Sequence, residues 1–205
     1  ILEVDGAFSP KNRSLDFDIQ MDDIELQALN PYVKKGLKDL SGTVDVDLTL
    51  DGTLDKPELN GTLNLEQGEA TITFLNTHYI FNDRARIYHN NVYLEDFVVL
   101  DEQGNSARIN GTLTNSYFKD FRTNVNIEAN NLICLNTTSF DNDVVYGSIF
   151  ATGNVGINGP FDAIKISVKA TTEENTAIYL PLYTAREVQS TDFISFVIKN
   201  EVNTV

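Results

Sequence analysis

Apolar and polar residues alternate with a period of two through most of this chain. The stretch GTVDVDLTLDG, residues 42–52, places aliphatic side chains at every second position and Thr or Asp between them. Successive side chains of a β-strand point to opposite faces, so each such segment predicts a strand with one apolar face. Clusters such as DEQGN (101–105) and DNDVVYG (141–147) separate the segments. We therefore expect a mainly β, antiparallel chain of roughly ten to twelve strands.

One segment departs from this period. In DIELQALNPYVKKGLKDLSG, residues 23–42, apolar residues recur every three or four positions and are interrupted by Pro31 and Gly36. This spacing predicts a short amphipathic helix near residues 24–39.

The alternating unit repeats along the chain. The strand and turn between Gly42 and Gly52 return between Gly147 and Gly159, and a looser copy covers residues 109–129. Repetition of one supersecondary unit indicates a sheet that grows along one axis. We expect one elongated fragment of a longer protein, 1–205, with strands and the helix in 1–39, repeated strand units in 40–182 and a connecting segment in 183–205.

Charge and composition narrow the class of function. The net charge is −15, from 30 acidic and 15 basic residues, which disfavours nucleic acid and a basic surface that docks on anionic lipid. Contact with lipid is therefore expected through apolar surface. The single cysteine, Cys134, excludes an intrachain disulfide. Because the chain begins ILEVDG without Met, we expect an excised fragment from which targeting or anchoring sequence was removed.

The motifs that would indicate catalysis or metal binding are missing from the sequence. It has neither a phosphate-binding Gly-x-x-x-x-Gly-Lys-Ser/Thr loop nor a Gly-x-Ser-x-Gly elbow. DVDLTLDG departs from the calcium-loop spacing, and His78 and His89 lack a ligand pattern. Adjacent acids such as Asp22-Asp23 and Glu95-Asp96 are interpreted as a solvated rim. We expect no catalytic residues, no cofactor and no metal.

The apolar face is then the candidate site, and it has two interpretations. In a closed sandwich its side chains would pack against a second sheet. In an incompletely closed sheet they would line a groove for acyl chains. The predicted groove lining is Val44, Val46, Leu48, Leu63, Leu65, Ile72, Phe74, Val98, Ile109, Leu113, Val125, Ile127, Ile149, Val155, Ile157, Ile164, Ile166 and Val168.

Several phrases of the sequence resemble a known family. They are LNPYVKKGLKDLSGTVDVDLTLDGTLDKPELNGTLNL, FLNTHYIFNDRARI, VVLDEQGNSARINGTLTNSYF, LNTTSFDNDVVYGSIFATGNVGINGPFDAIKISVKATT and IYLPL. Together they make residues 15–200 similar to the C-terminal region of the TamB family, within the wider AsmA-like group. The segment FNDRARIYHNN resembles Bacteroidetes versions.

This resemblance implies a fold and a function. The fold is a β-taco, an antiparallel sheet folded into a U-shaped trough with an apolar interior. TamB-like proteins belong to the translocation and assembly module of Gram-negative bacteria. An inner-membrane anchor, absent here, holds them across the periplasm, toward an outer-membrane insertase-class barrel such as TamA. The implied function is phospholipid transport in outer-membrane biogenesis, with acyl chains and neighbouring β-repeats as partners. The alternative is an assembly factor or scaffold for β-barrel insertion or protein secretion; an adhesive β-solenoid at the cell surface is a third.

Overall fold

The computed structural model describes residues 1–141 and 145–181 of the 205-residue chain, and in this part nearly all regular structure is β. The strands are β1 (Leu2–Ser9), β2 (Ser14–Glu25), β3 (Leu37–Thr53), β4 (Lys56–Ile72), β5 (Thr77–Phe81), β6 (Arg84–Tyr88), β7 (Asn91–Asp101), β8 (Ser106–Ser116), β9 (Lys119–Thr137), β10 (Tyr146–Pro160), β11 (Lys165–Thr172) and β12 (Ala177–Tyr179). The expected connecting segment, 183–205, lies outside the described residues.

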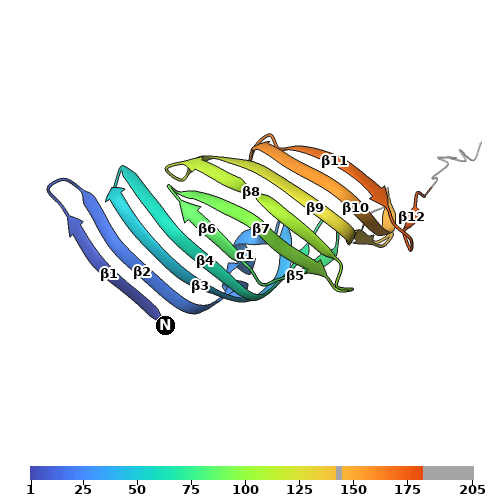
Figure 1. Ribbon diagram of the computed structural model, residues 1–205, viewed down its shortest axis with the longest axis horizontal. Coiled ribbons are helices and arrows are strands. Elements are labelled where there is room, and N and C mark those ends of the chain that lie inside the picture. Colours follow the sequence, from blue (N-terminus) through green and yellow to red (C-terminus); the bar gives the residue numbers. More distant parts are fainter. Residues whose placement is uncertain (142–144, 182–205) are drawn as a thin grey trace, which may run out of the picture.

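The described strands form one antiparallel sheet of 12 strands, as the alternating pattern predicts. Its order is β1-β2-β3-β4-β5-β7-β8-β9-β10-β11, with β6 between β4 and β7 and β12 beside β10. Figure 1 shows a single curved layer with β1 at one end and β11 at the other. These two edge strands do not pair with each other, so the sheet is open.

Several of the described strands bend at β-bulges, where one extra residue is inserted against the neighbouring strand. Residues with a positive φ mark these bulges at Asp23 in β2, Asp39 in β3, Gln67 in β4, Asp96 in β7 and Asn131 in β9. A bulge bends its strand and increases the local twist, so bulges distributed across the sheet favour the curvature in Figure 1.

At four of these bulges, a side chain on a following segment accepts a hydrogen bond from the backbone N–H of the residue with positive φ. The N–H groups of Asp23 and Asp96 donate to Asp45 Oδ1 at 2.9 Å and to Asn110 Oδ1 at 2.8 Å. The N–H of Gln67 donates to Asn82 Oδ1, and that of Asn131 donates to Thr152 Oγ1 at 2.8 Å. Because an unpaired backbone donor is costly, these short polar side chains stabilise the bends.

A short helical segment, η1 (Leu26–Leu29) followed by α1 (Asn30–Val33), lies within the predicted 24–39 region and packs on one face of the sheet. Leu26 is buried in a cluster with Leu40, Val44 and Ala70. The Asn30 amide holds the segment to β3, since Nδ2 donates to the Leu40 carbonyl at 2.9 Å and Oδ1 accepts from the Leu40 N–H at 3.0 Å. We call the face that carries this helix the inner face.

Candidate functional site: the apolar inner face

Strand register places one nearly continuous apolar row on the inner face. Directly paired residues of antiparallel strands point to the same side of a sheet. The row runs through Leu2, Met21, Val46, Leu63, Ala85, Leu94, Gly111, Val125, Ile157 and Ile166. Neighbouring strands lie about 4.8 Å apart, so a row across ten strands extends over roughly 43 Å.

Most residues of the predicted lining share this face, according to strand register and alternation. They are Val44, Val46, Leu48, Leu63, Leu65, Ile72, Ile109, Leu113, Val125, Ile127, Ile149, Val155, Ile157, Ile166 and Val168. Sequence reasoning left out Met21, Ala85 and Leu94, which the register places in the same row. Alternation marks such residues as apolar-face candidates, but only the pairing shows that they continue this row.

Three predicted lining residues require correction. Val98 lies on the opposite face, where it pairs with Arg108, because the bulge at Asp96 shifts the alternation by one position. Phe97 takes the inner position and is buried. Phe74 lies in the turn after β4 and is 77% exposed, and Ile164 lies in the turn before β11.

No second sheet covers the inner face in the described part of the chain. The helical segment packs over β3, where Val44, in the cluster with Leu26, is only 9% exposed. At the end strands, Leu2 and Val168 of the same face are both 65% exposed. The closed-sandwich interpretation is therefore wrong for the described residues, and the apolar face stays partly open to solvent.

The outer face is mostly polar, as the alternation predicts, with Val98 and Leu100 among its apolar exceptions. Arg86 Nη2 and Glu95 Oε1 form an exposed ion pair at 2.6 Å, and the Arg86 guanidinium lies 4.5 Å from the centre of the Tyr93 ring. A second, looser pair joins Arg108 and Asp96 at 3.7 Å. Exposed pairs of this kind contribute little to stability, so we interpret this face as the solvated side of the sheet.

A polar cluster, which we call the seam, joins β5 and β9 at the turn between β7 and β8. Asp101 is 1% exposed, and its Oδ1 accepts from the N–H groups of Gln103 and Asn105, each at 2.9 Å. Its Oδ2 accepts from the Ile133 N–H and from Asn105 Nδ2, each at 3.0 Å. The Tyr79 hydroxyl donates to the Ile133 carbonyl at 2.7 Å, and burial raises the pKa of Tyr79 to about 12. The seam thus links segments that are distant in sequence.

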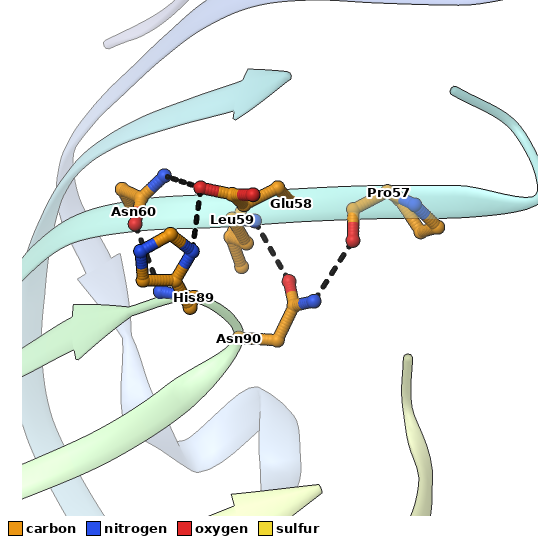
Figure 2. Close-up of polar contacts among 6 residues, drawn as sticks. All are labelled: Pro57, Glu58, Leu59, Asn60, His89 and Asn90. Atoms are coloured by element: carbon orange, nitrogen blue, oxygen red, sulfur yellow. Dashed lines mark hydrogen bonds and ion pairs between the residues drawn. The ribbon is translucent and has the colours of Figure 1, made fainter. Parts of the chain in front are cut away.

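The turn between β6 and β7 is fastened to β4, as Figure 2 shows. The Asn90 side-chain amide forms two hydrogen bonds to the backbone of β4, as the backbone of a neighbouring strand would. Oδ1 accepts from the Leu59 N–H at 2.7 Å, and Nδ2 donates to the Pro57 carbonyl at 2.8 Å. His89 Nδ1 lies 2.7 Å from Glu58 Oε1. Here β4 continues beyond the end of β6, and Asn90 satisfies backbone groups that would otherwise be unpaired.

The remaining polar residues do not form a metal centre within the described residues. His78 contacts Thr71 and Glu69, and in residues 1–141 and 145–181 no group of three or more His, Cys, Asp or Glu side chains is arranged to hold a metal ion. None of the helices described there is long and apolar enough to cross a bilayer.

Comparison with known proteins supports the family that the sequence resembles. The model of the TamB C-terminal domain matches residues 2–92 and 95–204, nearly the whole chain. A search of curated proteins and a search of solved structures each found no match. On the strength of the family match, the chain belongs to the TamB C-terminal domain family.

Proposed function

We propose that this chain carries phospholipid, with acyl chains lying along the inner face and head groups in water. Membership in the TamB family indicates a role in the translocation and assembly module, a transport and assembly system. The proposal adds the cargo and the surface that binds it. It also places the chain in the periplasm of a Gram-negative envelope, as part of a protein anchored in the inner membrane and working with an outer-membrane insertase barrel such as TamA.

The observation that carries the proposal is the apolar row from Leu2 to Ile166, which has no covering sheet among the described residues. Transferring a methylene group from water to an apolar surface is favourable by about 0.8 kcal/mol. A chain of about sixteen carbons therefore faces a cost of roughly 12 kcal/mol in water. A face that stays apolar from strand to strand would remove most of this cost along its length.

The two faces differ in the way that such cargo requires. Inner positions of β8 hold Ile109 and Leu113, whereas the alternate positions hold Arg108 and Thr112. A zwitterionic or anionic head group is strongly hydrated, and burying it without partners is expensive. An open sheet accommodates both parts of the lipid, because the tail contacts the inner face while the head group remains in solvent.

A matched pair of substitutions tests the proposal. Leu113→Asp places a carboxylate on the inner face, and Thr112→Asp adds the same charge to the outer face one residue away. Lipids that co-purify with each variant are quantified by mass spectrometry against the unaltered chain, after circular dichroism has shown that both variants fold. We expect Leu113→Asp to lose most bound phospholipid and Thr112→Asp to keep it. Equal lipid content in the two variants would refute the proposal.

The free strand edges favour a second candidate, assistance to outer-membrane β-barrel proteins. Among the described residues, β1 pairs only with β2 and β11 pairs only with β10, so each leaves one edge open to another strand. Addition of a strand to an open edge is a common mode of peptide recognition. Photocrosslinkers at Val4 and Val168 should then capture β-barrel precursors in cells. Recovery of lipid alone at both positions would remove the support for this candidate.

A further inference from the structure

One long edge of the sheet carries exposed apolar side chains on four of its five hairpin turns. We call it the hairpin edge and define it as residues 10–13, 53–56, 88–91, 116–122 and 160–165. In Figure 1 these turns follow one another along the upper border of the sheet. Their exposed large apolar side chains, each between 45% and 55% exposed, are Leu54, Tyr88, Tyr117, Phe118, Phe161 and Ile164.

The hairpin edge is basic although the chain is acidic. Its cations are Lys11, Arg13, Lys56, Lys119, Arg122 and Lys165, and its carboxylates are Asp55, Asp120 and Asp162. The excess of cations contrasts with the net charge of −15 for the whole chain. Among the described residues, the one ion pair within this edge joins Arg13 Nη1 to Asp55 Oδ2 at 2.8 Å. The other cations thus keep their charge available to a partner.

The opposite edge of the sheet has an excess of acidic residues. It includes the end of β2 at residues 22–25, the helical segment, residues 34–39 at the start of β3, and the turns at 101–105 and 173–176. Acidic residues predominate there, since Asp22, Asp23, Glu25, Asp39, Asp101, Glu102, Glu173 and Glu174 stand against Lys34, Lys35 and Lys38. The overall net charge therefore conceals an asymmetry between the two edges, and only one of them would be attracted to an anionic surface.

We infer that the hairpin edge docks on a bilayer that contains anionic phospholipid. Aromatic rings at the head-group level combined with Lys and Arg are typical of membrane interfaces, and Lys stems contact the apolar layer while their ammonium groups reach phosphate. Hairpin turns two strands apart lie about 10 Å from one another, so they form a row of separate points. A protein partner would need a packed patch of roughly 800 Å². A lipid surface fits separate points without such a patch.

This docking is distinct from acyl-chain carriage on the inner face. It requires the turns alone, and it orients the trough with one edge against the membrane. The total charge disfavours a basic docking surface, but it averages the two edges. The hairpin edge is an exception at the level of local charge.

Vesicle co-sedimentation tests the docking with matched variants of the 205-residue chain. The probes are phosphatidylcholine vesicles with and without phosphatidylglycerol. The charge variant Lys11→Gln/Lys56→Gln is compared with Lys34→Gln/Lys35→Gln, which removes the same charge from the opposite edge. Each cation close to an anionic surface strengthens partitioning about fivefold. We expect the first pair to bind phosphatidylglycerol vesicles roughly 25-fold more weakly and the second pair to bind like the unaltered chain.

The apolar contribution is tested by Leu54→Ser/Phe118→Ser against Phe74→Ser/Phe140→Ser, all of which replace exposed side chains. The first pair should weaken binding to phosphatidylglycerol vesicles, and the second should not. Absence of vesicle binding by the unaltered chain would overturn the inference, as would equal losses in the hairpin-edge variants and their controls. Binding of the basic edge to an acidic protein instead of vesicles would also overturn it.

Discussion

Replacing Asp101 by Asn tests whether the polar seam holds the sheet together. The carboxylate is buried and accepts hydrogen bonds from four donor groups. Oδ1 accepts from the N–H groups of Gln103 and Asn105, Oδ2 accepts from the Ile133 N–H, and Asn105 Nδ2 lies 3.0 Å from Oδ2 and 3.3 Å from Oδ1. In Asp101→Asn, an amide NH2 replaces one oxygen, so whichever way it turns it meets two donors. If it faces the Ile133 N–H and Asn105 Nδ2, the Ile133 N–H loses its acceptor and Asn105 Nδ2 keeps only the longer bond to Oδ1, at 3.3 Å. Turned the other way, the N–H groups of Gln103 and Asn105 lose theirs.

A lost bond to a charged acceptor costs about 1.5–3 kcal/mol, so the loss of one such bond together with the loss or weakening of a second should lower the unfolding free energy by roughly 3 kcal/mol. For a chain of this length, that corresponds to a decrease in Tm of about 6–12 °C. Urea unfolding monitored by circular dichroism measures the free energy directly. Asp96→Asn is the control, because the Asp96 carboxylate is exposed and Asn also tolerates the positive φ found there. Equal stability of Asp101→Asn and Asp96→Asn would refute the reasoning.

Three further predictions follow from single side chains. Burial raises the pKa of Tyr79 from 10.0 to about 12, so an ultraviolet titration should show its ionisation near pH 12. Its contribution to stability is present below about pH 10 and is lost as pH rises toward 12. Ionisation of Tyr79 near pH 10 would contradict this prediction. Burial raises the pKa of the Cys134 thiol, so iodoacetamide should alkylate the folded chain more slowly than the urea-unfolded chain at the same pH; equal rates would count against it. Asn90→Gly keeps the positive φ but removes the amide that pairs with Leu59 and Pro57, so urea unfolding should show a loss of about 1–3 kcal/mol, whereas an unchanged midpoint would disprove that role.

The period-two pattern was sufficient to predict a mainly β fold, because alternation of apolar and polar residues gives one apolar face to a strand but not to a helix. Val44, Val46 and Leu48 follow this pattern without interruption, and the register places all three on the inner face. The short helix was also predictable, since the spacing of its apolar residues changes to three and four before Pro31.

The error at Val98 has a physical cause that alternation alone does not contain. A bulge adds one residue to a strand, and every position beyond it then changes face. The sequence does carry a signal, because Glu95-Asp96 interrupts the alternation with two adjacent polar residues and Asp tolerates a positive φ. Asp22-Asp23 marks the bulge in β2 in the same way. The interpretation of both pairs as a solvated rim therefore misses their structural role.

The seam and the hairpin edge depend on contacts between distant segments. Nothing in the local sequence indicates that Asp101 accepts a hydrogen bond from the Ile133 N–H. Asp101 ends β7 and Ile133 lies in β9, so the two meet only after β8 and β9 have paired. Likewise, the Asn90 amide pairs with β4 only because β6 is shorter than the strand beside it. Such features follow from the lengths of neighbouring strands after folding, and pattern analysis of one strand at a time does not contain them.

Site-specific photocrosslinking to phospholipid tests the central claim most directly. A photoreactive residue is placed at Val46 or Val125 on the inner face, and at Asp47 or Asn126 on the outer face of the same strands. After irradiation in cells, mass spectrometry identifies the adducts. Acyl-chain carriage on the inner face predicts phospholipid adducts at Val46 and Val125 and few at the outer positions. Adducts of equal yield on both faces, or none on the inner face, would contradict it.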